Sequence, residues 1–168
     1  MTPAVTAALS QIESILLWGL VATVAMTTVM YGSQGLGLSR LSLPFLLGTA
    51  LTADRNWANV LGFTLYTLGG WLFAFLYFLA FFYLGAATWW LGGLLGVLHG
   101  LFLLVAVLPV APYAHPRMAS EYDGPTDTRQ LEPPGFMGLN YGYRTPLVTL
   151  AAQSIYGVVL GAFYPVPG

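Results

Sequence analysis

His99 is a strongly ionisable side chain inside a long apolar stretch, LGGLLGVLHGLFLLVAVLPV, at positions 91–110. Hydrocarbon penalises an ionisable side chain unless it is paired, so such residues mark either interhelical contacts or functional sites. Three kinds of chemistry suit an imidazole here. It can hold neighbouring helices together by hydrogen bonds, handle a proton or a substrate, or ligate a haem or a chlorophyll-type pigment. The sequence leaves these three alternatives open.

Polar residues on the other apolar stretches fall at a depth similar to that of His99, counted from the ends of each predicted helix. A shared depth brings polar groups into one layer of a helix bundle, where they can hydrogen-bond across helices. The candidate midplane polar layer consists of His99, Thr23, Thr67, Gln153 and Ser154.

Other chemistries lack their residues. The chain has no cysteine, which excludes disulfides, zinc–thiolate sites and iron–sulfur clusters. It has no lysine, which excludes a Schiff-base enzyme and a phosphate-loop ATPase. His115 lies about 24 Å beyond His99 if the helix continues, too far to share a metal ion. No nucleophile–base pair has a recognisable spacing, so we expect neither an enzyme nor a metal site.

Composition places the chain in a membrane. Hydrophobic residues make up 57% of its 168 residues and charged residues only 7%, whereas a soluble domain carries about 25% charged residues. The net charge of −1 argues against a nucleic-acid partner, which requires a clustered basic face. We expect a single membrane domain over residues 1–168, with the lipid bilayer as its main partner.

The apolar stretches predict an all-α integral membrane protein with four transmembrane helices. Three of them are close to the length of about 20 apolar residues that crosses a bilayer, and the second is longer, so it must tilt or protrude. The first has no basic region before it, so we expect it to remain in the mature protein rather than be removed as a signal peptide. The prolines at positions 109 and 112 are expected to close the third helix. The predicted spans are 14–32, 58–84, 88–110 and 146–164.

Two connections join these spans on one side of the membrane. The first contains LSLPFLLGTAL at 41–51, which is too short to span and predicts an interfacial or re-entrant piece. The polar loop 111–145 forms the other. All the arginines fall on this side, which the positive-inside rule makes cytoplasmic. We therefore expect a bacterial inner-membrane protein with both termini periplasmic. The arginines are Arg40, Arg55, Arg117, Arg129 and Arg144.

Interfacial aromatic residues agree with this orientation, because tryptophan and tyrosine favour the two membrane surfaces. Trp18, Trp89, Trp90 and Tyr164 would mark the periplasmic surface. Tyr31, Trp57 and Tyr113 would mark the cytoplasmic one.

Spans two and four share a pattern of small and aromatic residues. The second contains Gly70-x-x-Phe73-Ala74-x-x-Tyr77, and the fourth contains Gly157-x-x-Leu160-Gly161-x-x-Tyr164. A tandem duplication of a helix hairpin would explain the pattern, and so would the general abundance of glycine and aromatic residues in membrane helices.

The cytoplasmic loop is rich in aromatic residues and turn signals, which predicts an ordered segment. An exposed Arg117–Glu121 pair at i, i+4 contributes only about 0.3–0.5 kcal/mol. Ordering the loop therefore requires burial of its aromatic residues against the bundle or a partner. The candidate docking residues are His115, Arg117, Phe136, Tyr141 and Tyr143.

Several local motifs are distributed over most of the chain. The loop contains HPRMASE, GPTDTR, LEPPGF and NYGYRTP, and the segments before it contain GLVATVAMTTVM, LTADR and GLLGVLHG. Together they resemble a group of small bacterial four-helix inner-membrane proteins of unknown function. That resemblance implies no activity, cofactor or binding residue.

The function expected from these observations is a non-enzymatic accessory or structural subunit of a larger bacterial membrane assembly, with other membrane subunits as partners. The aromatic-rich second span would pack on those partners. The alternative is a small transporter or channel-like protein that uses the polar layer around His99.

Overall fold

The computed structural model describes residues 2–164, and their fold is all-helical. Four helical stretches are long and apolar enough to cross a membrane: Ile12–Gly35, Arg55–Leu84, Trp89–Ala114 and Thr145–Phe163. Their middle turns expose large aliphatic side chains on the outside of the bundle, a surface that suits lipid rather than water. The predicted four-helix architecture is confirmed, with each helix shifted or lengthened by a few residues.

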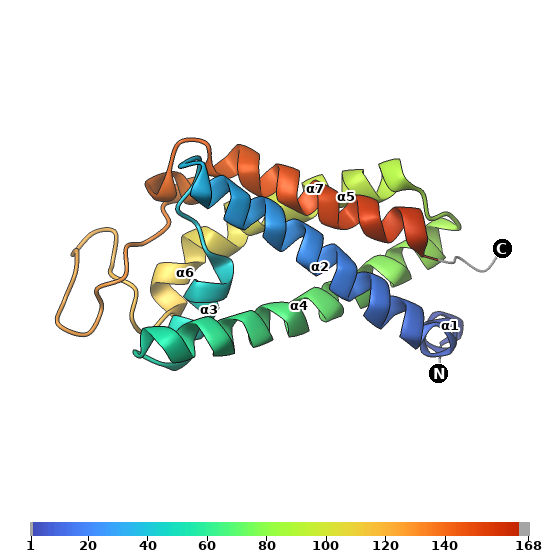
Figure 1. Cartoon of the computed structure of the whole chain (residues 1–168), viewed down its shortest axis with the longest axis horizontal. Helices are drawn as coiled ribbons and strands as arrows, with labels where there is room; N and C mark the ends of the chain where they lie inside the picture. Colours follow the sequence, from blue (N-terminus) through green and yellow to red (C-terminus); the bar gives the residue numbers. More distant parts are fainter. Residues whose placement is uncertain (1, 165–168) are drawn as a thin grey trace.

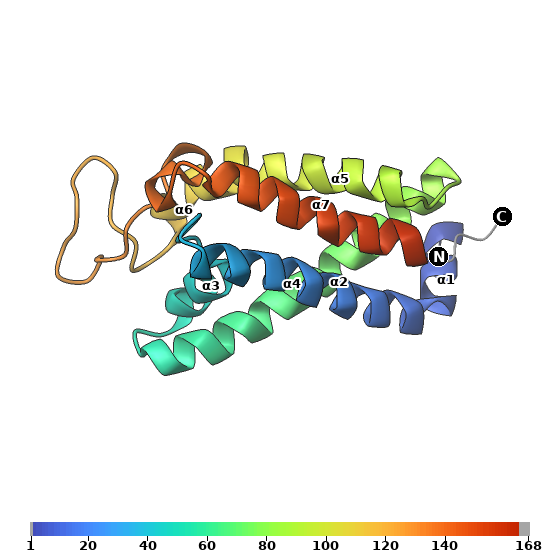
Figure 2. The same cartoon turned by 45° about the horizontal axis from the view of Figure 1, so that its top comes forward.

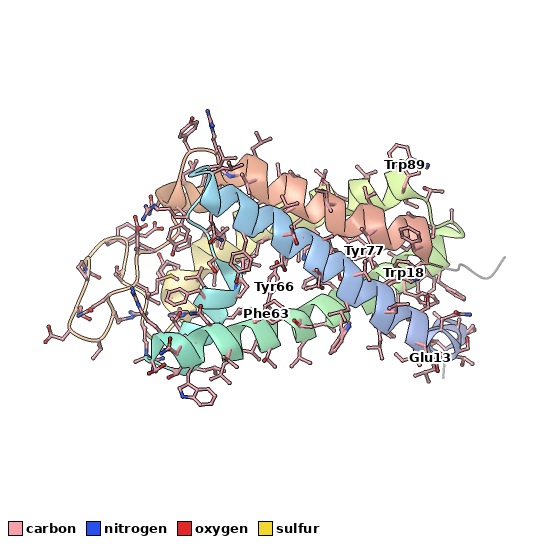
Figure 3. All side chains as sticks on the ribbon, viewed as in Figure 1. Glu13, Trp18, Phe63, Tyr66, Tyr77 and Trp89 are labelled. Carbon is pink, nitrogen blue, oxygen red and sulfur yellow. The ribbon has the colours of Figure 1, made fainter. Side chains whose placement is uncertain are left out.

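These stretches form an elongated bundle, with the first and third of the connections between them at one end and the second connection at the other (Figure 1). The helices are α1 (Pro3–Ser10), α2 (Ile12–Gly35), α3 (Leu43–Leu51), α4 (Arg55–Leu84), α5 (Trp89–Phe102), α6 (Leu108–Ala114) and α7 (Thr145–Phe163). A π-helical turn, Leu103–Val107, joins α5 to α6, and a 3₁₀ segment, Phe136–Tyr141, precedes α7. Helix α1 and the end of α7 lie at the end opposite the polar loop, where Trp18 and Trp89 are found (Figures 1 and 3).

The closest helix pair is α5 and α7, which run side by side in both views (Figure 2). Glycines form the contact. A Cβ added at Gly92 would overlap the carbonyl of Gly157, and one at Gly157 would overlap Gly92 in return. Gly96 and Gly161 are similarly pressed against the opposite backbone. Glycines four residues apart on both helices thus permit backbone contact, which is a main source of helix association in lipid.

Glycine also seats α3 against α4. A Cβ at Gly48 would overlap the carbonyl of Ala58, and one at Gly62 would overlap that of Pro44. The side chain of Ser42 caps the first turn of α3 by accepting a hydrogen bond from the amide of Phe45 at 3.4 Å. The short apolar run predicted as an interfacial or re-entrant piece is therefore a helix of 9 residues packed on the next span.

Helices α4 and α5 meet at a tight turn and then diverge (Figures 1 and 2). Gly85 makes this turn in the left-handed conformation, with φ of 68°. Beyond it α5 follows α7, whereas α4 follows α2 and α3. The backbones of the two helices therefore separate beyond the turn, although Phe73 and His99 still meet between them, and α3 and α6 lie between their separated ends.

The expected end of the third span at its prolines is wrong. Helical structure continues past Pro109 and Pro112 to Ala114, through the π-helical turn. A proline lacks the N–H of a helical hydrogen bond and its ring strikes the carbonyl four residues earlier. The wider π turn relieves both problems for Pro109 by changing the local hydrogen-bond pairing. The end expected for the fourth span, at Pro165, lies outside the described residues, and α7 itself ends at Phe163.

We predict that Gly157→Ala destabilises the bundle by about 1–3 kcal/mol, because the added methyl group forces α5 and α7 apart. Gly32→Ala is the matched control, since a Cβ at Gly32 meets nothing within 4 Å. Thermal unfolding of the purified variants in mild detergent measures the effect. Equal midpoints for Gly157→Ala and Gly32→Ala would contradict the proposed backbone contact.

Candidate functional site

A cavity of about 480 Å³ lies where α4 and α5 diverge. Helices α3, α4, α5 and α6 form its walls, and Met26, Gln153 and Tyr156 of α2 and α7 form its floor. Most of the remaining lining is aliphatic or aromatic. Leu47 and Phe102 also line the cavity and are exposed on the outer surface of the bundle, so the cavity opens sideways between the helices.

His99 lies at the inner end of this cavity, surrounded by aromatic rings. Its imidazole stacks on Phe73, with ring centroids 4.0 Å apart and planes 27° from parallel. Tyr77 and Tyr156 approach the same imidazole with centroid distances of 6.1 and 6.2 Å. The hydroxyl of Tyr156 donates to the carbonyl of Gly70 at 2.6 Å, which fixes the position of that ring. The imidazole is therefore held in a fixed orientation, mainly by packing.

Two buried polar atoms without hydrogen-bond partners among the described residues, one on His99 and one on Gln153, belong to residues that line the cavity. Within residues 2–164, four buried side-chain atoms have no hydrogen-bond partner: Tyr77 Oη, His99 Nδ1, Thr149 Oγ1 and Gln153 Oε1. They come from α4, α5 and α7. Each unpaired buried group costs about 1–3 kcal/mol. A bound molecule carrying a hydroxyl or carbonyl group would offset part of this cost.

Two residues of the predicted midplane layer, His99 and Gln153, line the cavity. The structure does not bring the others to it. The hydroxyl of Thr23 donates to the carbonyl of Gly19 at 2.8 Å, within its own helix. Thr67 and Ser154 are half-buried and lie outside the cavity lining. Of the predicted layer, only His99 of α5 and Gln153 of α7 therefore face a space that a ligand can occupy.

Sequence reasoning missed the aromatic partners of His99. Sequence patterns alone do not single out Phe73, Tyr77 or Tyr156 as site residues, because aromatic residues are common in apolar helices. In the structure all three surround His99. Tyr77 and Tyr66 project from α4 into the interior and are buried (Figure 3). Their spacing of about three helical turns could have indicated that they share one face.

The electrostatics of the cavity favour a neutral occupant. No arginine lines it, and no group of three or more metal-binding side chains occurs among the residues described. Haem carries two propionates, which would find no cation here, so the cavity does not suit a haem at His99. This objection does not apply to a neutral pigment, which carries no charged group.

Two arginine side chains cap the C-terminal ends of α3 and α6 at the loop end. The Arg117 Nη1 donates to the carbonyls of Thr49 and Ala50 at 2.7 and 3.2 Å, at the C-terminus of α3. The Arg129 Nη2 donates to the carbonyls of Pro112 and His115 at 2.7 and 3.2 Å, at the C-terminus of α6. A cation stabilises the terminal carbonyls of a helix both by hydrogen bonding and through the helix dipole.

His115 closes the cavity at the loop end. Its Nδ1 accepts from the amide of Arg117 at 3.1 Å, so the proton of the neutral ring is on Nε2. Nε2 lies 3.0 Å from the carbonyl of Leu46 and donates to it. The imidazole therefore joins the end of α6 to α3.

The predicted Arg117–Glu121 pair is not formed. Because α6 ends at Ala114, the residues after it are not helical, and Arg117 bonds α3 instead. Leu131 donates to the carbonyl of Arg117 at 3.0 Å and Ala119 donates to that of Leu131 at 2.8 Å. These bonds tie the base of the loop, and its tip extends away from the bundle rather than covering it (Figure 1).

Tyr141 fastens the second half of the loop. Its hydroxyl donates to the carbonyl of Glu132 at 2.6 Å, and burial raises its pKa to about 12. Arg40 connects this region to the segment between α2 and α3 through an ion pair with Glu132 at 2.9 Å, and this hydrogen-bonded carboxylate raises the pKa of Arg40. Phe136 and Tyr143 are 60% and 76% exposed. Of the three aromatic residues expected to be buried, only Tyr141 is buried within this chain.

Comparisons of the chain with protein-family models, with curated proteins and with solved structures give no match. The resemblance to small four-helix inner-membrane proteins therefore stays a hypothesis, and the function has to be argued from the site itself.

We predict that Tyr141→Ser increases the rate of limited proteolysis within 111–145 about tenfold or more, because it removes a buried ring and its hydrogen bond. Phe136→Ser is the matched control and should change the rate less than twofold, since that ring is exposed. Cleavage of the purified protein in detergent, followed by mass spectrometry, gives both rates. Similar rates for the two variants would show that Tyr141 does not anchor the loop.

Proposed function

We propose that this chain is a non-enzymatic membrane protein that binds a neutral, lipid-soluble molecule in the cavity between α4 and α5. The main support is the combination of an apolar cavity of about 480 Å³ with unpartnered polar atoms on His99 and Gln153 at its inner end. Ligand sites typically have this form, with a mostly apolar lining and a few polar groups that orient the ligand.

The position of the cavity indicates how a ligand would reach it. His99 lies near the middle of the Trp89–Ala114 span, at mid-membrane depth if that span crosses the bilayer. The cavity opens sideways beside exposed apolar residues, so a molecule dissolved in the bilayer can enter without crossing water. A charged head group would have to lose its hydration at this depth without gaining a counter-charge. A hydroxyl or carbonyl group of a neutral lipid would bind with a smaller penalty.

An accessory subunit of a larger membrane assembly is the second candidate. The aromatic face of the second span supports it less than expected, because Tyr77, Phe78 and Phe81 are buried within this chain. The exposed rings of Phe136 and Tyr143, beside an anchored part of the loop, favour it. A transporter or channel-like role would require a path through the loop end, which His115 and α3 close.

We also propose that the loop end is cytoplasmic and that both termini are periplasmic in a bacterial inner membrane. The arginines at residues 40, 55, 117, 129 and 144 belong to segments at the loop end, as the positive-inside rule requires.

Filling the cavity tests the proposed function. Gly69 lines the cavity and a Cβ there meets nothing within 4 Å, so Gly69→Phe should fill space without disturbing the fold. Gly32→Phe is the control, because Gly32 is equally open and does not line the cavity. We expect organic extracts of the purified wild-type protein and of Gly32→Phe to contain one neutral lipid near stoichiometric amount. Gly69→Phe should contain about tenfold less, which corresponds to a loss of about 1.4 kcal/mol.

His99→Leu and Gln153→Leu should reduce the retained lipid without preventing its entry, because they remove only the polar contacts. Mass spectrometry of the extracts quantifies the lipid in each variant. A wild-type extract that contains no enriched neutral lipid would argue against the proposed function. Equal contents in Gly69→Phe and Gly32→Phe would place any bound lipid elsewhere.

The orientation is tested with single cysteines, since the natural chain has none. Ser10→Cys should react with a membrane-impermeant maleimide in intact bacterial cells, and Thr126→Cys should react only after the membrane is opened. Both positions are exposed, so burial does not limit their reactivity. The opposite labelling pattern would place the loop in the periplasm.

A further inference from the structure

A second cleft, of about 630 Å³, lies at the loop end between α3, the start of α4 and the loop. Unlike the cavity at His99, it is lined by charged side chains, namely Arg55, Arg117 and Asp127. Phe45 and Leu131 provide apolar walls beside them. The two sites differ in polarity and in depth, so they would take different ligands.

Two guanidinium groups line this cleft, those of Arg55 and Arg117. Arg55 begins α4 and is exposed, and its side chain makes no hydrogen bond or ion pair within residues 2–164. Arg117 uses Nη1 to bind the carbonyls at the end of α3, which holds its guanidinium in place while leaving its other donors unused. Together these groups offer several N–H donors to the oxygens of a phosphate, the geometry that arginine suits best.

A carboxylate lies on the loop side of the same cleft. Asp127 forms no ion pair within the part of the chain that the structure describes, although two arginines line the cleft with it. The nearby Arg129 is occupied with the carbonyls of α6. Opposite charges thus line one open cleft without neutralising each other. A ligand that carries both charges complements this arrangement, whereas a simple anion would be repelled by Asp127.

The surroundings of the cleft match a membrane surface. Trp57, on the first turn of α4, and Tyr113, near the end of α6, are 61% and 73% exposed, as expected for residues at the head-group level. The apolar side chains of Phe45 and Leu131 in the lining suit contact with the start of an acyl chain. A zwitterionic phospholipid places its phosphate and its amine at this level and its chains in the hydrocarbon.

We infer that this cleft binds the head group of an aminophospholipid, with the phosphate held by Arg55 and Arg117 and the primary ammonium held by Asp127. The ammonium donates hydrogen bonds to the carboxylate, and the phosphate oxygens accept from the guanidinium groups. A trimethylated amine has no N–H to donate, and a glycerol head group has no positive charge. The cleft should therefore prefer phosphatidylethanolamine over both phosphatidylcholine and phosphatidylglycerol. This inference does not depend on the ligand proposed for the cavity at His99.

Short-chain lipids test the preference on the full-length protein in detergent. Dihexanoyl phosphatidylethanolamine, phosphatidylcholine and phosphatidylglycerol are titrated separately, and the shift of the thermal unfolding midpoint gives the apparent affinity. We expect phosphatidylethanolamine to bind about tenfold more tightly than either of the others. Inorganic phosphate and free ethanolamine are titrated in parallel. Equal affinities for the three lipids, or a shift with phosphate as large as with phosphatidylethanolamine, would overturn the inference.

Variants then separate the two charges. Arg55→Gln should weaken binding of both phosphatidylethanolamine and phosphatidylglycerol about fivefold or more, because each uses its phosphate. Asp127→Asn should remove the preference for phosphatidylethanolamine while leaving phosphatidylglycerol binding equal or tighter. Asp123→Asn is the control, since Asp123 is an exposed loop carboxylate outside the cleft. A preference that survives Asp127→Asn, or that Asp123→Asn removes equally, would overturn the assignment of the ammonium to Asp127.

Discussion

The contact between the backbones of α5 and α7 determines much of the remaining structure. Gly92 and Gly157 let the two helices approach until main-chain atoms touch, and in lipid such packing replaces the hydrophobic effect as a source of association. Because α5 follows α7, it separates from α4 directly after their common turn. The space between them holds α3, α6 and the cavity at His99. A bulkier side chain at either glycine would change the position of the whole α5–α6 stretch.

The two ends of this space are stabilised by different interactions. At mid-span, stacked and tilted aromatic rings hold His99, while its Nδ1 and the Oε1 of Gln153 have no hydrogen-bond partner within residues 2–164. At the loop end, Arg117 and Arg129 bind carbonyls at the ends of α3 and α6, and His115 joins α6 to α3. These bonds give the loop end a hydrogen-bonded frame, whereas the inner end of the cavity, like the cleft at Arg55, retains unused hydrogen-bonding groups. Ligand sites generally combine a rigid frame with such unused groups.

The tandem-duplication hypothesis gives the cavity a structural context. Under that hypothesis α2 corresponds to α5 and α4 to α7, so the α2–α7 and α4–α5 interfaces would be equivalent. The first is closely packed, and the second is open beyond its turn. The two interfaces differ because the short helices α3 and α6 lie between α4 and α5, whereas no described helix separates α2 from α7. If the chain arose by duplication, the cavity lies where the two halves differ most.

Length and apolarity alone determined the four membrane-length helices, because any chain segment in hydrocarbon must satisfy its backbone hydrogen bonds internally. The arginine distribution likewise placed the charged segments at one end. Two features depended on tertiary structure. Gln153 joined His99 at the cavity, while Thr23 did not, because the depth of a residue in its helix says nothing about the direction in which it faces. The third span passed through its prolines because a π-helical turn accommodates Pro109, and α6 can then pack beside α3. Such choices depend on contacts between distant segments, which local sequence patterns do not encode.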